Sequence, residues 1–240
     1  MKEKVKSMNE CLEVKNLNVW YEFNKPIIKN LDLTIYDNEI VGLIGLNGAG
    51  KTTLFNTITN VHDKYKCDEI KFNNKQISFN DIDFKYNRFI VFSEDESFQY
   101  FTFNEYIKYT FQCYNKKIDE KLVTDLCEKL NFTDYRNVLM RKLSLGNKRK
   151  AHLITGLALK CKILILDEPF NGIDFEGTET LYDLLQEYKN YGTVIFSSHI
   201  LETICMITDR ILILEKGKIT NSYNSNEFDV NNIRKELSDV

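Results

Sequence analysis

Hydrophobic residues follow two patterns along this chain. Four short runs are apolar at nearly every position, which is typical of strands buried on both faces of a sheet. They are VGLIGL at 41–46, FIVF at 89–92, ILIL at 163–166 and TVIF at 193–196. In contrast, residues 12–21 and 27–36 alternate apolar and polar side chains. This alternation predicts two half-buried antiparallel strands, joined through a turn near Asn24, Lys25 and Pro26.

Helices and hairpins are predicted between these strands. A helix is expected over residues 51–59, after a glycine-rich turn, and another over 176–189, where leucines recur at helical spacing. Hairpins are expected around Asn73-Asn74 and around Lys216-Gly217.

The middle of the chain has the pattern of a helical insertion. Thr102 and Glu105 match a capping box, which predicts a helix that runs to about Tyr114. Asp119 is a suitable N-cap for the amphipathic helix that follows. Residues 102–141 are therefore expected to be mostly helical.

Strands that alternate with helices predict an α/β fold. We expect one domain over residues 1–240. An N-terminal antiparallel β subdomain and the α/β core are expected to take up residues 12–90 and 151–223, and a helical subdomain residues 95–150. The polar tail, 224–240, has no pattern that assigns it a role.

Composition and charge limit the class of partner. The chain has 32 basic and 35 acidic side chains and a net charge of −3, so no nucleic-acid partner is expected. The first ten residues, MKEKVKSMNE, have no apolar segment behind their charges, which predicts a cytoplasmic protein without a signal peptide. No apolar run approaches the roughly 18 residues that span a bilayer, so a membrane role would need a partner. The six cysteines lack C-x-x-C spacing and are interpreted as small buried hydrophobic residues.

The strongest chemical signal is EIVGLIGLNGAGKTT at residues 39–53, where an apolar strand leads into a glycine-rich turn. Gly45, Gly50, Lys51 and Thr52 fit the G-x-x-x-x-G-K-[ST] pattern of a phosphate-binding loop. Backbone N–H groups of such a loop point at the phosphates, and a Cβ at a glycine would block the path. Lys51 is expected to reach the terminal phosphates and Thr52 to bind Mg²⁺. A turn without a ligand is the alternative, but it does not require Lys and Thr in register.

Two later strand ends also carry polar groups. ILIL is followed by Asp167 and Glu168, and strand alternation predicts that these acids lie on different faces. We expect Asp167 to hold Mg²⁺, often through water, and Glu168 to face the attacking water. His199 follows TVIF and is a candidate hydrogen-bond partner of the γ-phosphate or the water. Two solvated acids in a loop are the alternative for Asp167 and Glu168, but the buried strand and the phosphate loop that accompany them disfavour it. Taken alone, His199 would more often be a helix-capping or core histidine.

Five motifs in order resemble the ATP-binding cassette of ABC transporters, over about residues 12–219. They are GLNGAGKTT (Walker A), LSLGN (signature), ILILDEP (Walker B), NGID (D-loop) and SSH (switch histidine). The resemblance implies a P-loop NTPase of the ABC type that hydrolyses ATP with Mg²⁺. It also implies a head-to-tail homodimer, or a heterodimer with a second cassette, on the inner face of the membrane beside a separate transmembrane permease.

The resemblance also assigns roles to residues. It implies that Lys51, Glu168 and His199 are catalytic, and that Thr52, Asp167 and Glu94 of the Q-loop lie at the metal. The residues it implies for ATP binding are Tyr21, which would stack on adenine, and Gly45, Leu46, Asn47, Gly48, Ala49, Gly50, Lys51, Thr52, Thr53, Ser144, Leu145, Gly146 and Asn147.

Two departures from the family pattern bear on the type of transporter. Leu145 stands at a signature glycine and Asn147 at the usual glutamine, and LSLG variants resemble cassettes of bacteriocin and peptide-antibiotic exporters. Glu94 in place of Gln also resembles exporter cassettes. We therefore expect export of a peptide, antibiotic or other amphipathic compound. A soluble ABC-type ATPase acting on a non-transport assembly is the alternative, and a GTPase or small-molecule kinase would leave the signature and His199 unexplained.

Overall fold

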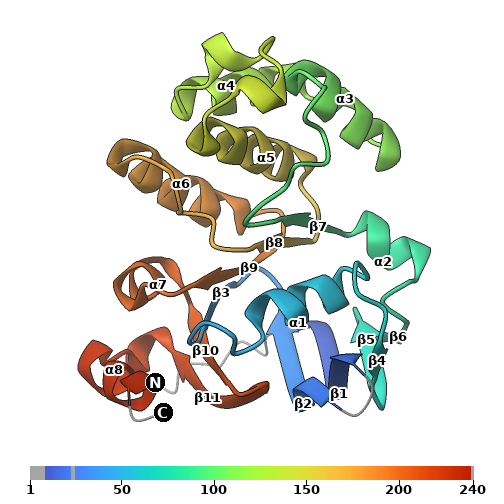
Figure 1. Ribbon diagram of the computed structural model, residues 1–240, viewed down its shortest axis with the longest axis vertical. Coiled ribbons are helices and arrows are strands. Elements are labelled where there is room, and N and C mark those ends of the chain that lie inside the picture. Colours follow the sequence, from blue (N-terminus) through green and yellow to red (C-terminus); the bar gives the residue numbers. More distant parts are fainter. Residues whose placement is uncertain (1–8, 23–24, 239–240) are drawn as a thin grey trace, which may run out of the picture.

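The structure, a computed structural model, describes residues 9–22 and 25–238 and contains two sheets (Figure 1). Residues 1–8 of the N-terminal charged segment lie outside these residues, and so does Asn24 of the expected turn. The antiparallel sheet has five strands in the order β2-β1-β5-β6, with β4 paired to β1. Their bounds are β1 (Glu10–Glu22), β2 (Lys25–Tyr36), β4 (Tyr65–Lys66), β5 (Glu69–Phe72) and β6 (Lys75–Gln76).

The hairpin expected at Asn73-Asn74 is confirmed, and both residues have positive φ, as the turn of a tight hairpin requires. The sequence predicted the turn between β1 and β2 too far toward the C-terminus. Lys25 and Pro26 belong to β2 and pair with Glu22 and Trp20 of β1. Proline lacks an N–H but is tolerated here because β2 is an edge strand.

The second sheet has six strands in the order β11-β10-β3-β9-β8-β7, and all of them except β11 run parallel. Their bounds are β3 (Ile40–Ile44), β7 (Arg88–Val91), β8 (Ile163–Leu166), β9 (Thr193–Ser198), β10 (Arg210–Glu215) and β11 (Lys218–Asn224). Every residue of β3, β8 and β9 is buried. The apolar runs at 41–46, 163–166 and 193–196 are therefore confirmed as interior strands of this sheet, whereas the run at 89–92 forms β7 at its edge.

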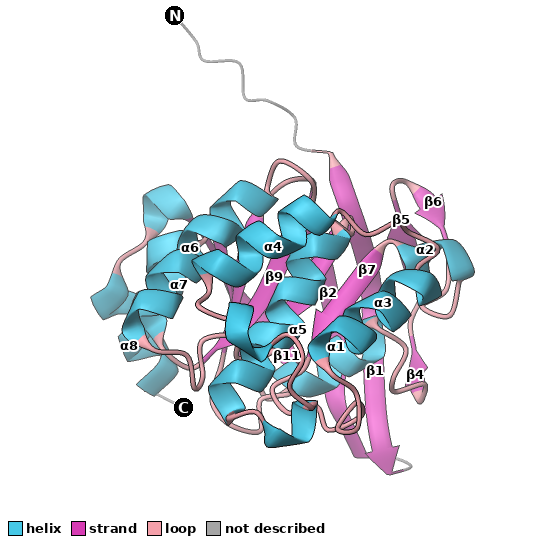
Figure 2. Ribbon diagram, turned by 90° about the horizontal axis from the view of Figure 1, so that it is seen from above, coloured by secondary structure: helices cyan, strands magenta, loops and turns pink. Residues whose placement is uncertain are grey.

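Helices cover the parallel sheet and connect it to the antiparallel sheet. Figure 2 shows α4, α5 and α6 lying over the strands, and α1 packs between the two sheets through Leu54 and Phe55. The helices are α1 (Lys51–Ile58), α2 (Ile82–Tyr86), α3 (Phe103–Cys113), α4 (Glu120–Lys129), α5 (Leu145–Leu159), α6 (Phe175–Tyr188), α7 (Leu201–Ile207) and α8 (Val230–Ser238).

The helical insertion has the predicted caps. The N–H of Glu105 donates to Thr102 Oγ1 (3.3 Å), and Glu105 Oε2 accepts from the N–H of Thr102 (2.7 Å). Asp119 caps α4 by accepting from the N–H of Leu122 (3.1 Å). These helices pack on α5 and gather at the end of the molecule opposite the antiparallel sheet (Figure 1).

Part of the polar tail is helical, and one cysteine that was expected to be buried is exposed. Residues 230–238 form α8, which packs on α7 through the buried Ile233 and through an ion pair of Arg234 with Glu202. One apolar side chain per turn is too weak a pattern to find such a helix from sequence. Cys113 is exposed on α3, so the cysteines are not all buried.

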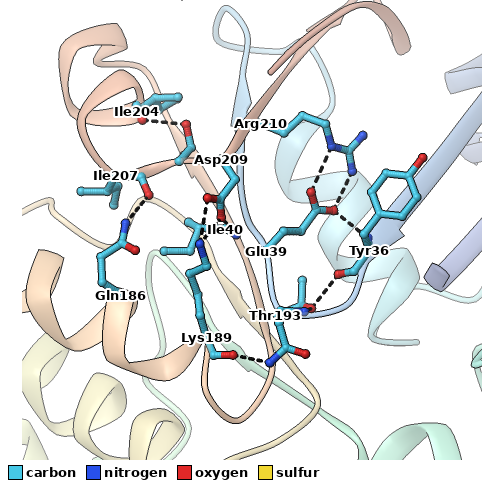
Figure 3. Close-up of polar contacts among 12 residues, drawn as sticks. Tyr36, Glu39, Ile40, Gln186, Lys189, Thr193, Ile204, Ile207, Asp209 and Arg210 are labelled. Atoms are coloured by element: carbon cyan, nitrogen blue, oxygen red, sulfur yellow. Dashed lines mark hydrogen bonds and ion pairs between the residues drawn. The ribbon is translucent and has the colours of Figure 1, made fainter. Parts of the chain in front are cut away.

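A polar network joins the two sheets at the base of the parallel strands (Figure 3). Glu39 is 4% exposed, and its Oε1 accepts from the N–H of Tyr36 (2.6 Å) and from Nη2 of Arg210 (2.7 Å). Arg210 also donates from Nε to Glu39 Oε2 (3.1 Å) and from Nη2 to the carbonyl of Thr34 (2.6 Å). This bidentate pair ties the end of β2 to the starts of β3 and β10.

We expect Arg210→Met to lower the free energy of unfolding by about 3–5 kcal/mol, because it leaves the buried Glu39 carboxylate without its counter-charge. Urea unfolding monitored by circular dichroism measures this change. Lys25→Met is the matched control, since its ion pair with Glu22 is solvent-exposed and should contribute little. Equal losses in the two variants would contradict the role assigned to Arg210.

Candidate functional site: a phosphate-binding cavity

The phosphate loop follows β3 directly and closes onto the first turn of α1. Gly45 is required by a close backbone approach, because a Cβ there would lie 2.3 Å from the carbonyl oxygen of Leu214. Gly50 has φ +112°, and its Cβ would lie 2.7 Å from Cδ1 of Ile28. Gly45 and Gly50 thus fit the loop against its own protein neighbours, whereas a Cβ at Gly48 would meet no protein atom within 4 Å.

Lys51 lies at the start of α1 and is 8% exposed. Its Nζ donates to the carbonyl of Gly45 (2.7 Å) and less closely to that of Leu46 (3.4 Å). Burial lowers the pKa of Lys51, and the nearby charges of Glu168 and Asp167 act in the opposite direction. An anion bound in the loop would therefore meet the Lys51 ammonium group, which is already held beside the loop.

The loop forms the floor of a cavity of about 350 Å³. Its described lining residues are Ile27, Asn47, Gly48, Ala49, Gly50, Lys51, Thr52, Thr53, Ser93, Asp167 and Glu168. Backbone N–H groups, one cation and two carboxylates thus converge on one space, which is the arrangement that a metal-bound polyphosphate needs.

Asp167 and Thr52 meet within this cavity. Thr52 Oγ1 donates to Asp167 Oδ2 (2.9 Å), while Asp167 Oδ1 accepts from Ser197 Oγ (2.6 Å). A hydroxyl and a carboxylate are the oxygen donors that Mg²⁺ prefers, and Mg²⁺ commonly takes its other ligands from phosphate and water. Among the described residues no group of three or more His, Cys, Asp or Glu could hold a metal. The oxygens of Thr52 and Asp167 therefore fit Mg²⁺ that takes its remaining ligands from a nucleotide and water.

Glu168 and His199 pair beside the loop. Glu168 Oε2 lies 3.0 Å from Nδ1 of His199, and both residues line a neighbouring cavity with Gly45, Leu46 and Asn47. Glu168 has φ +50°, so the chain leaves the extended conformation directly after Asp167. The expectation that alternation separates the two acids onto different faces was wrong, because both line the phosphate cavity.

In the segment after β7, the residue that lines the phosphate cavity is Ser93, one position before the predicted Glu94. Ser93 lines the phosphate cavity, whereas Glu94 is exposed and lines a separate cavity beside α5. Arg149 of α5 holds this segment, since Nη1 donates to the carbonyls of Phe92 (2.8 Å) and Asp167 (3.2 Å) and Nη2 donates to that of Ser93. Neither Ser93 nor Arg149 was identified from sequence. Only the position of Arg149, on a predicted helix just after the signature, could have indicated it.

The signature residues lie outside the phosphate cavity. Ser144 caps α5 by accepting from the N–H of Asn147 (3.2 Å), and Leu145 is 61% exposed. Gly146 packs closely on the D-loop, because a Cβ there would lie 2.3 Å from the carbonyl oxygen of Gly172. None of residues 144–147 is among the described residues that line the cavity over the loop.

Tyr21 lies near the end of β1, beside the part of β2 that leads to Ile27 in the cavity wall. Its ring is 45% exposed, and its centroid lies 4.3 Å from that of His62. His62 is itself held by a 3.0 Å hydrogen bond between Nε2 and the carbonyl of Trp20. The sequence had assigned His62 no role, but in the structure it supports the exposed aromatic ring.

The fold and this cavity define a P-loop nucleoside triphosphatase. The family model for ABC transporters matches residues 28–171. AlbC, a Bacillus subtilis protein named as an ABC transporter ATP-binding protein, is 34% identical over 215 residues, covering 87% of this chain and 89% of AlbC. The chain therefore belongs to the ABC transporter family. It is the subunit that binds and hydrolyses ATP.

A further relative agrees with this assignment, and solved structures agree with the fold. The ribose import ATP-binding protein RbsA of Clostridium perfringens is 32% identical over 96% of this chain and 48% of its own length. The structure of an ATP-binding subunit of an ABC transporter has a TM-score of 0.82 at 22% identity, covering 95% of this chain and 93% of that one. A dimeric bacterial ABC transporter cassette has a TM-score of 0.80 at 20% identity, covering 90% and 100%. These two structures support the fold alone. Among the described residues, no helix is long and apolar enough to cross a membrane.

We expect Lys51→Ala to weaken ATP binding by at least about tenfold, because a charge pair at about 4 Å is worth about 4 kcal/mol at an effective dielectric of 20. Titration calorimetry with ATP measures the affinity. Lys75→Ala, which removes an exposed lysine of β6, is the control. An ATP affinity that Lys51→Ala leaves unchanged would refute the assignment of the phosphate loop.

Proposed function

We propose that this chain powers a separate transmembrane permease, and that the transporter exports a peptide, an antibiotic or another amphipathic compound. The signature variant LSLGN supports export by its resemblance to exporter cassettes. The chain would act at the inner face of the membrane through its permease.

The observation that carries the coupling to a permease is an apolar groove next to the phosphate cavity. The groove has a volume of about 450 Å³ and lies between α2, β7 and α3. Val61 (64% exposed), Ile82 (65%) and Tyr86 (41%) line it, and exposed apolar side chains gathered in a groove indicate a protein partner. Phe92 lines the groove while the next residue, Ser93, lines the phosphate cavity. A partner in the groove would thus be one residue away from the nucleotide site.

Five residues of the phosphate cavity and its neighbouring cavity have a role in the proposed reaction. Lys51 would neutralise charge on the terminal phosphates. Thr52 and Asp167 would hold Mg²⁺, which when bound would supply positive charge next to those phosphates. Glu168 orients or deprotonates the attacking water, and Nδ1 of His199 donates to the Glu168 carboxylate and holds it in place.

A second cassette would complete the site. Ser144 and Leu145 lie at the surface and outside the cavity of their own chain, although the family resemblance assigns the signature to ATP binding. A head-to-tail dimer would place the signature of one chain over the loop of the other. Leu145, exposed at this surface, would then contact the partner cassette. The partner is a second copy of this chain or a different cassette.

We expect Glu168→Gln to lower ATP turnover about 100-fold or more while ATP affinity stays within about twofold, since a positioned base contributes roughly 10²- to 10⁴-fold. Phosphate release measures turnover, and titration with ATP measures affinity. Glu176→Gln, at the start of α6, is the control for loss of one carboxylate. Turnover close to wild type would refute the role of Glu168.

Co-purification tests the permease. Tagged Glu168→Gln chain, incubated with ATP and recovered from detergent-solubilised membranes of its host, should carry a polytopic membrane protein in stoichiometric amount. Ile82→Glu should lose this protein, because a buried charge in the groove is costly. Met206→Glu, which changes an exposed apolar residue of α7, should retain it. Recovery with ribosomal or other soluble assemblies alone would favour the non-transport ATPase instead.

A further inference from the structure

Ser197 lies near the end of β9 and is fully buried. Its hydroxyl joins the two acids that follow β8. Ser197 Oγ accepts from the backbone N–H of Glu168 (2.9 Å) and donates to Asp167 Oδ1 (2.6 Å). Since the oxygen accepts the amide proton and an ionised carboxylate has no proton to give, the direction of both hydrogen bonds is fixed.

The first of these bonds acts on the backbone of Glu168. A residue with a Cβ rarely adopts φ near +50°, and this conformation persists only where the surroundings impose it. The amide of Glu168 is anchored by Ser197, and the carboxylate is paired with His199 (3.0 Å). The end of β9 thus holds Glu168 at both its backbone and its side chain.

The second bond acts on the carboxylate of Asp167. Asp167 is 2% exposed, and its two oxygens are divided between Ser197 and Thr52. With Oδ1 held by Ser197, Oδ2 is the oxygen that faces Thr52 and the cavity. Without Ser197, the carboxylate could rotate about its terminal bond, whose torsional preference is broad.

We propose that Ser197 is a positioning residue for ATP hydrolysis. One buried hydroxyl sets the carboxylate of Asp167 toward Thr52 and, through the amide, sets the direction in which Glu168 leaves the strand. The inference rests on the roles proposed above for Asp167 and Glu168. Ser197 itself need not touch the nucleotide.

Three variants test this role. Ser197→Ala removes both hydrogen bonds, Ser197→Thr keeps the hydroxyl, and Thr110→Ala removes a buried hydroxyl of α3 that instead donates to the carbonyl of Tyr106 (2.8 Å). We would measure kcat and KM for ATP hydrolysis with Mg²⁺, ATP affinity in EDTA, and the thermal unfolding midpoint of each variant.

We expect Ser197→Ala to lower kcat about tenfold or more while ATP affinity in EDTA stays within about twofold, because the phosphate loop and Lys51 are unchanged. Ser197→Thr should recover most of the lost kcat, and Thr110→Ala should stay within about twofold of wild type. A purely structural role would instead lower the unfolding midpoint and reduce affinity and kcat together.

A kcat of Ser197→Ala within about twofold of wild type would overturn the proposal, and so would a parallel fall in kcat and EDTA affinity. If Ser197→Thr proves unstable, the separation of kcat from affinity in Ser197→Ala decides the question alone. Glu168→Gln, assayed beside them, separates the two levels of argument. If Glu168→Gln is inactive while Ser197→Ala is normal, only the positioning role fails, whereas an active Glu168→Gln overturns both.

Discussion

The register of the three central parallel strands is the constraint on which the site depends. Leu166 of β8 pairs with Phe196 of β9, and Ile44 of β3 pairs with Ser198 of β9. The phosphate loop, the acids and the serine-histidine segment all begin at these strand ends, so backbone pairing alone brings them to one edge. Because every residue of the three strands is buried, a shift of one position would exchange the packing of both faces at once. The apolar packing thus fixes the polar geometry.

Helix α5 is the second organising element, because it connects the cavity with its surroundings. Its Arg149 is 4% exposed and donates to carbonyls from two different segments, one after β7 and one after β8. Gly146 lies nearer the start of the helix and packs on the carbonyl of Gly172, and Lys150, the residue after Arg149, pairs with Asp174 (3.1 Å). The signature helix therefore contacts the D-loop and the strand ends within its first two turns.

The sequence was most informative where a signal is local. Strands such as 163–166, the cap at Thr102 and the phosphate loop each depend on residue type and spacing over a few positions. The positive φ of Glu168 could not be read in this way, because it depends on a hydrogen bond to Ser197, which is 29 residues away. Arg149 could not be predicted for the same reason. The carbonyls that it binds belong to Phe92 and Asp167, which are 57 and 18 residues away in the chain.

The placement of Phe92 and Ser93 links the two functional surfaces through covalent structure rather than through a long network. Phe92 contributes to the apolar groove, Ser93 to the phosphate cavity, and one guanidinium, that of Arg149, holds the carbonyls of both. The same Nη1 donates to the carbonyl of Asp167, the residue paired with Thr52. Breaking these bonds would leave a buried cation without acceptors, which is costly. If a partner in the groove displaced Phe92 and Ser93, the hydrogen bonds of Arg149 would be kept only if α5 moved with them. The signature residues lie at the exposed start of α5 and would move too.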